Sequence, residues 1–133
     1  MKPFVNTTQL EEEIGSTIVQ ASFEVHKQLG PGLLENIYEI CLIYQLRKFG
    51  LEVTEQVKVP IIYDGQILSQ NHLRLDLIVN NLVIIELKAV EMMHPVFKAQ
   101  IISYLKLTNK NLGYLINFNV PLIKDGITRI RRN

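Results

Sequence analysis

The sequence has a single cysteine, Cys41, among 133 residues. One cysteine excludes a disulfide within the chain and a zinc site made of several cysteines, and it fits the reducing cytoplasm where we expect the protein. Cys41 lies in an apolar helical pattern, so we expect it to be a small core residue.

Long apolar runs and biased segments are also missing. No run reaches about 18 apolar residues, so we expect no membrane span, and the N-terminus lacks the apolar stretch of a signal peptide. We find no internal repeat, linker or low-complexity segment. A length of 133 residues, with 47% hydrophobic and 20% charged residues, predicts one globular domain, residues 1–133.

Net charge is nearly absent, at +1, so composition alone does not indicate nucleic-acid binding. The charges are unevenly distributed, however. Residues 1–57 have four lysines and arginines against eight acids, and residues 88–133 have eight against two. A basic half beside an acidic site would suit a polyanionic substrate. Scattered solubilising charge with a solvated Arg131-Arg132 tail explains the same counts equally well.

Apolar periodicity and turn residues predict an α/β protein. The spacing indicates helices over residues 8–29, 33–49 and 95–107. Strand patterns, with turns at Asp64-Gly65 and Asn80-Asn81, cover residues 51–63, 66–68, 74–79, 82–88, 112–118 and 127–131. We expect the polar residues 69–72 to interrupt the strands before the central pair. The resulting order, two helices, three or four strands, a helix, a strand and a short strand, predicts a mixed β-sheet flanked by helices.

The most informative stretch is residues 74–88, two apolar strands joined at Asn80-Asn81. Asp76 lies in the first strand, and Glu86 and Lys88 lie near the end of the second. Charges are almost never fully buried unless they are paired or bind a metal. Glu86 and Lys88 are two residues apart, so they share one face of their strand.

The register between these strands decides whether the charges meet. A two-residue turn would pair position 76 with position 85 and point Glu86 away from Asp76. A three-residue loop or a bulge shifts the pairing by one residue and sets Asp76 opposite Glu86. We predict this second register, which brings both carboxylates and Lys88 into one pocket. Two close carboxylates repel, and a hard divalent cation resolves this; a structural network of ion pairs is the alternative.

Other residues around this pocket have two interpretations each. Glu35, in the first turn of its helix, either complements the helix dipole or supplies a third carboxylate. Gln100 and Tyr104 lie one helical turn apart and therefore stand together. His26 is expected to be a hydrogen-bonded structural residue, and His72 a surface loop residue.

These residues resemble a known family. The order of elements, with Asp76, then Glu86-Leu87-Lys88 and a following helix, resembles the PD-(D/E)XK nuclease superfamily and its restriction-endonuclease-like core. Gly32-Leu33-Leu34-Glu35-Asn36-Ile37-Tyr38 is similar to the G-x-x-E-x-x-Y signature of the small GxxExxY family. The resemblance covers the chain from about Val25 to the C-terminus. One departure is Leu75, where the superfamily name has proline.

The resemblance implies a role for each matching residue. Asp76 and Glu86 would be metal ligands, with the Leu87 carbonyl as a third and Glu35 as an outer ligand. Lys88 would be the catalytic lysine. Gln100 and Tyr104 match the Q-x-x-x-Y motif of the exonuclease-like branch, where they support the site and contact the substrate. 

The predicted function is therefore a nuclease dependent on Mg²⁺ or Mn²⁺ that acts on nucleic acid, with DNA expected. In it, Asp76 and Glu86 hold the metal and Lys88 positions the attacking water. Two alternatives stay open: a non-catalytic module of the same fold that binds nucleic acid or a protein, and a purely structural domain. A homodimer would add substrate-binding surface, but the sequence shows no decisive interface.

Overall fold

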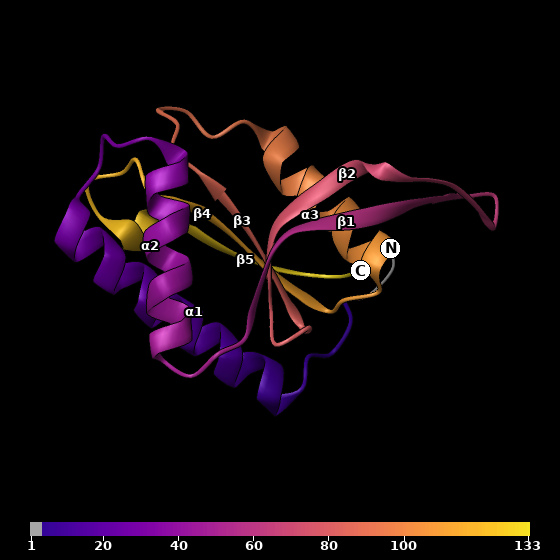
Figure 1. The fold of residues 1–133 in the computed structure, drawn as a ribbon, viewed down its shortest axis with the longest axis horizontal. Helices are drawn as coiled ribbons and strands as arrows, with labels where there is room; N and C mark the ends of the chain where they lie inside the picture. The colour runs from indigo at the N-terminus through magenta and orange to yellow at the C-terminus, as the bar shows by residue number, and fades with distance from the viewer. Residues whose placement is uncertain (1–3) are drawn as a thin grey trace.

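The computed structural model describes residues 4–133 and confirms the predicted α/β fold, a mixed sheet with helices on both faces (Figure 1). In chain order the elements are α1 (Gln9–Leu29), α2 (Glu35–Lys48), β1 (Val53–Tyr63), β2 (Gln66–Val79), β3 (Val83–Lys88), α3 (Pro95–Thr108), β4 (Leu112–Asn117), the 3-10 turn η1 (Ile123–Gly126) and β5 (Ile127–Arg131). This order is the predicted one.

The five strands form one sheet in the order β1-β2-β3-β4-β5. Only β3 and β4 are parallel, and α3 connects them; the other neighbours are antiparallel. Parallel neighbours need such a crossover because a tight turn cannot join them. The carboxyl end of β3, which carries Glu86 and Lys88, therefore leads directly into the connection to α3.

Two cores hold the layers together. Helices α1 and α2 pack on one face of the sheet through side chains such as Ile18, Leu42 and Ile85, and α3 packs on the other through Ile101 and Leu105 (Figure 1). The predicted core position of Cys41 is confirmed in part, because this residue is half-buried and packs against the α1–α2 side.

The start of α1 is stabilised by its capping residues. The Thr8 hydroxyl accepts a hydrogen bond from the Glu11 amide, and the Glu11 carboxylate accepts one from the Thr8 amide, which makes a capping box. At the other end of the helix, the His26 ring nitrogen Nε2 lies 2.8 Å from the Val120 carbonyl oxygen. His26 is thus the structural histidine that we predicted.

The predicted interruption at residues 69–72 is wrong. Strand β2 is continuous, and it forms with β1 a two-stranded ribbon that projects beyond the rest of the molecule, at the right of Figure 1. Its turn lies at Asp64-Gly65, as predicted. Residues in the outer part of the ribbon are mostly exposed, including the apolar Tyr63, Ile67 and Leu68, so the polar residues 69–72 can lie within a strand there.

The arginines of the basic half, unlike Lys88, do not lie beside Asp76 and Glu86. Arg131 pairs with Leu112, which is next to Val83 at the start of β3, whereas Lys88 pairs with Asn117 at the other end. The C-terminal arginines have local partners instead: Arg129 pairs with Glu12, Arg131 lies over the Phe4 ring, and Arg132 donates to the Lys110 carbonyl. None of the described helices is both long and apolar enough to cross a membrane.

Candidate active site

Strands β2 and β3 separate where the two predicted carboxylates lie, and we call this point the fork. The paired ladder ends at Leu77 and Ile85. Beyond it, the Asp76 amide donates to Glu86 Oε1 at 3.0 Å, and the Leu87 amide donates to Asp76 Oδ2 at 2.8 Å. Each carboxylate therefore accepts an N–H group that the separating strands leave without a backbone partner.

The loop between these strands confirms the predicted register. Val79 pairs with Val83, so three residues, Asn80 to Leu82, connect the strands. Asn80 and Asn81 have φ of 50° and 54°, a conformation that asparagine tolerates better than other non-glycine residues. This loop is what sets position 76 opposite position 86.

Among residues 4–133, no lysine or arginine forms an ion pair with the acids at the fork. The pKa of the Glu86 carboxyl is raised to about 8, first by burial and then by the charge of Asp76. Burial also raises the pKa of Glu35, of Glu39 and of the Tyr104 phenol, and the charge of Asp76 contributes to each of these shifts. Side chains from α2 and α3 thus lie close enough to Asp76 to feel its charge.

Lys88 lies against α3 and shares a strand face with Glu86, two residues before it. Its Nζ is 4.3 Å from the centroid of the Phe97 ring, a favourable cation–π contact that restrains the side chain. The positive charge of Lys88 acts to lower the pKa of both Glu35 and Glu86. Among residues 4–133, Lys88 has no carboxylate within ion-pair distance, so its ammonium group is available to a water molecule or a phosphate.

A buried tyrosine anchors the start of α2, where Glu35 lies. The Tyr38 ring is fully buried and stacks on Phe118 with a centroid distance of 4.8 Å. Its hydroxyl donates to the Gly30 carbonyl at 2.6 Å and accepts from the Leu33 amide at 3.1 Å. These bonds fix the loop before α2, and with it the first helical turn that carries Glu35.

The glycine of the G-x-x-E-x-x-Y motif also has a structural role. Gly32 has φ of 97°, which L residues rarely adopt. The three motif positions therefore provide a tight loop, an acid and an anchor.

Sequence reasoning missed Gln56 and Glu39. Gln56 lies opposite Asp76 in the β1–β2 register, with φ of 47°. Its amide donates to the Glu39 carboxylate at 3.0 Å, which joins β1 to α2 beside the fork. A non-glycine residue at positive φ leaves no trace in the apolar pattern, so only the structure could find it.

Asn117 was also missed as a site residue, although an asparagine in the apolar segment 112–118 was a visible signal. Its side-chain amide is buried, accepts from the Val90 amide at 3.1 Å and donates to the Val90 carbonyl at 3.0 Å. The connection that follows Lys88 is thereby fixed to the end of β4.

The remaining predicted residues are placed less tightly. Gln100 is exposed on α3, one turn before Tyr104, and no hydrogen bond joins its side chain to another described residue. Leu87 is buried, with its main chain beside Asp76.

Across residues 4–133, no group of three His, Cys, Asp or Glu side chains is arranged to hold a metal. Two carboxylates still fit Mg²⁺, which usually keeps several waters and takes one or two carboxylates from the protein.

The sequence matches one known protein family. Residues 12–130 match the family model of the PD-(D/E)XK nuclease superfamily. The chain belongs to this superfamily. No curated protein and no solved structure matches it. Membership supports a nuclease-type function, and nucleases of the superfamily generally use divalent metals.

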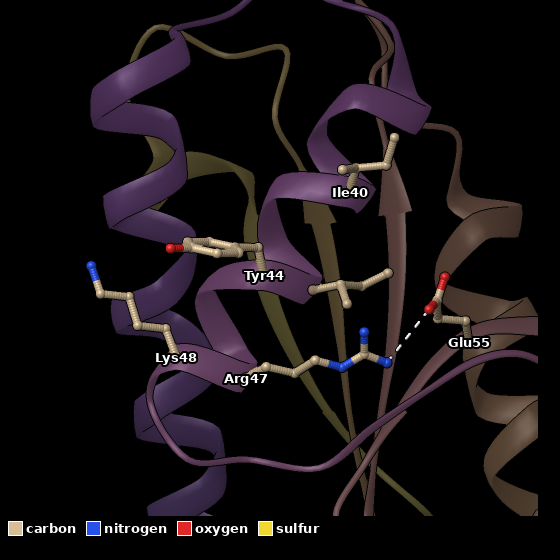
Figure 2. Close-up of a pocket in the computed structure, with 6 residues that line it drawn as sticks. Ile40, Tyr44, Arg47, Lys48 and Glu55 are labelled. Atoms are coloured by element: carbon tan, nitrogen blue, oxygen red, sulfur yellow. Dashed lines mark hydrogen bonds and ion pairs between the residues drawn. The ribbon is translucent and has the colours of Figure 1, made fainter.

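A surface groove beside α2 is a second place to look for a site in this superfamily member. It follows the outer side of α2 and is lined by Ile40, Tyr44, Arg47, Lys48 and Glu55 (Figure 2). An ion pair between Arg47 and Glu55 crosses its floor, and it has no second carboxylate. Because it offers no pair of acids, this groove is not the candidate catalytic site.

Proposed function

We propose that the protein is a divalent-metal-dependent nuclease that hydrolyses phosphodiester bonds of nucleic acid, with DNA as the expected substrate. The observation that carries this proposal is the fork. There Asp76 and Glu86 face each other across the point where β2 leaves β3, and Lys88 lies two residues beyond. The raised pKa of Glu86 supports it, because burial and the charge of Asp76 disfavour the ionised carboxylate, which a bound cation would stabilise.

Asp76 and Glu86 would hold Mg²⁺ or Mn²⁺, with the Leu87 carbonyl and the Glu35 carboxylate as further oxygen donors. When bound, such an ion supplies Lewis-acid chemistry at a phosphate oxygen and lowers the pKa of a bound water. The cost of holding two carboxylates close together is then offset by the ion that they bind.

Lys88 would orient the attacking water and balance the charge that develops on the phosphoryl oxygens. In this hydrolysis the attacking water loses a proton to solvent as its oxygen forms a bond to phosphorus, the bond from phosphorus to the 3′ oxygen breaks, and the leaving oxygen takes a proton from solvent. The contact between Lys88 and Phe97 limits the positions of the ammonium group before the substrate arrives.

Membership of the smaller GxxExxY family is part of this proposal. It is supported by the distinct roles of Gly32, Glu35 and Tyr38 in one turn beside the fork. Tyr104, whose phenol senses the charges of Glu86 and Asp76, would support the site, and Gln100 would contact the substrate.

One observation favours a second candidate, a non-catalytic module that binds nucleic acid or a protein. The carboxylates of Asp76 and Glu86 both accept backbone hydrogen bonds, and within the described chain no third acid joins them in a ready-made metal site. A homodimer stays a prediction; the exposed side chains Ile40 and Tyr44 on α2 offer apolar surface for one.

A plasmid-nicking assay with Mn²⁺ or Mg²⁺ separates these candidates. Asp76→Asn and Lys88→Met should each lower the cleavage rate by about 10²–10³-fold, the usual loss when one electrostatic group in an active site is removed. The matched controls are Asp125→Asn and Lys124→Met, in and near η1, which should cleave at the wild-type rate. Cleavage that survives both site substitutions, or that EDTA does not stop, would contradict the proposal, and metal binding without cleavage would favour the module.

A further inference from the structure

Few cations lie near the fork, because the arginines of the C-terminal half have partners elsewhere. Lys88 belongs to the candidate active site itself. The nearest others along the strands are Lys58 on β1 and Arg74 on β2, and Arg74 is only two residues from Asp76. Two residues of strand span about 7 Å, so Arg74 lies next to the candidate active site.

Lys58 and Arg74 are direct cross-strand partners in the ribbon. Both are exposed, and neither has a carboxylate within ion-pair distance among residues 4–133. The only side-chain contact of Lys58 is a long hydrogen bond from Nζ to Asn71 Oδ1, at 3.4 Å. Like charges that lie directly opposite each other destabilise a strand pair. Folding therefore gains nothing from this arrangement, and a ligand that carries negative charge would relieve it.

Both side chains point away from the core. Their neighbours along the strands, Val57, Val59 and Leu75, belong to the core that α3 covers. Side chains alternate between the faces of a strand, so Lys58 and Arg74 lie on the opposite, open face of the ribbon. The ribbon itself runs from the fork to the projecting part at the right of Figure 1.

The basic charge is confined to this base of the ribbon. Between the two cations, residues 59–73 include one acid, Asp64 at the tip, and no lysine or arginine. A general surface for polyanions would spread its charge along the whole ribbon. A single cross-strand pair beside the fork fits one or two phosphates next to the bond that is cut.

We infer that Lys58 and Arg74 clamp the phosphodiester backbone of the substrate beside the scissile phosphate. This inference rests on the proposed nuclease function and adds the group that positions the strand. The guanidinium of Arg74 binds phosphate oxygens through two parallel hydrogen bonds, and Lys58 adds a point charge. Contacts of this kind position a nucleic acid without reading its sequence.

The test compares a double variant, Lys58→Gln with Arg74→Gln, with a control that loses the same charge, Lys27→Gln with Lys124→Gln. The control residues are exposed at the end of α1 and in η1, at the opposite end of the long axis from the ribbon (Figure 1). Binding of fluorescein-labelled duplex DNA is measured by anisotropy, with Ca²⁺ in place of Mg²⁺, between about 50 and 200 mM salt.

For the clamp variant we expect the slope of log K against log salt to become shallower by about 1.8, because each phosphate contact contributes about 0.9. KM for cleavage should rise at least tenfold while kcat at saturating DNA stays near the wild-type value. The melting temperature should stay equal or rise, because repulsion between the two cations is removed. The control variant should keep the wild-type slope and KM.

The outcomes separate this inference from the proposed function. If wild-type protein cleaves DNA but the clamp and control variants have the same salt slope and KM, the clamp is wrong and the nuclease assignment stands. A clamp variant that loses kcat with an unchanged KM also contradicts the clamp. If wild-type protein neither binds nor cleaves DNA, both proposals fail.

Discussion

Acidic side chains have different partners at the fork and at the contact between the start of α1 and β5, near the two ends of the described chain. At the ends, Glu12 of α1 pairs with Arg129 of β5, and the Thr7 hydroxyl also donates to Glu12. These contacts lower the pKa of Glu12, mainly through the hydrogen bond from Arg129. At the fork, burial and the charge of Asp76 raise the pKa of Glu35 and Glu86.

The pKa shifts of the two groups of acids have opposite signs, which indicates that the groups have different roles. A carboxyl whose pKa is lowered on folding stabilises the folded chain in its ionised form, whereas one whose pKa is raised destabilises it when ionised. The pair between Glu12 and Arg129 therefore serves the fold. The acids at the fork reduce stability in the metal-free protein when they are ionised, which agrees with our proposal that they bind a metal ion.

The largest difference between the two regions should be in the cleavage rate of variants that lose one acid. Glu86→Gln keeps the side-chain shape and a hydrogen-bond acceptor for the Asp76 amide but removes a charge, so we expect the cleavage rate to fall by about 10²–10³-fold. Glu12→Gln, the matched control, should cleave at the wild-type rate. Plasmid-nicking rates at saturating Mn²⁺ measure both variants, and an equal effect of the two would remove the distinction.

Stability should change with pH in the direction set by Glu86. Its pKa is about 8 in the folded protein and ordinary, near 4.5, in the unfolded chain, so unfolding releases a proton between these values. The free energy of unfolding of the metal-free protein should therefore fall as pH rises through this window, by up to about 1.4 kcal/mol for each pH unit. Denaturant unfolding of wild type and Glu86→Gln at pH 5.5 and 8.5, in EDTA, gives the difference.

The variant should lose little stability between these two pH values and be the more stable protein at the higher one. Saturating Mn²⁺ should flatten the wild-type curve, because the bound ion favours the ionised form. A wild-type stability that rises with pH relative to the variant would contradict the raised pKa.

Tyr38 links the fold to the fork, and its hydroxyl should matter for both. Tyr38→Phe keeps the ring stacked on Phe118 but removes the bonds to Gly30 and Leu33, at a cost of about 1–2 kcal/mol. Cleavage should fall several-fold, because the loop that carries Glu35 is less constrained. Chemical denaturation and nicking rates are the measurements. Tyr44→Phe, at a residue that is 66% exposed, is the control and should change neither.

The smallest effect should come from the pair at the chain ends. Arg129→Gln should lower the free energy of unfolding at pH 7 by about 0.2–1 kcal/mol, since both side chains are about 41% exposed and solvent screens their attraction. The pair stabilises the fold only while Glu12 is ionised. The difference from wild type should therefore disappear as pH falls below the ordinary range of glutamate. A loss of activity larger than the loss of stability would show that this pair is not purely structural.

The sequence was sufficient for the elements and for the central register. Alternating and helical apolar periods located three helices and the core strands, and the requirement that Asp76 and Glu86 meet selected the three-residue loop at Asn80. These features depend on local patterns and on the cost of burying unpaired charge, which one sequence records.

Features that depend on how the layers pack against each segment could not be predicted from the sequence. Residues 69–72 read as a break because their polar character comes from the lack of a covering helix, not from a turn. Gln56 and Glu39 meet only because β1 passes α2, 17 residues away in the chain. The distance of Arg131 from the fork follows from strand order, which composition does not contain.

The most direct test of the central claim is a calorimetric titration of the metal-free protein with Mn²⁺, carried out in parallel on Asp76→Asn. We predict saturable binding to wild type with release of protons at pH 7, because Glu86 must ionise to bind the ion, and binding at least tenfold weaker to the variant. Equal binding to both proteins, or none to wild type, would contradict the claim that the fork holds the metal.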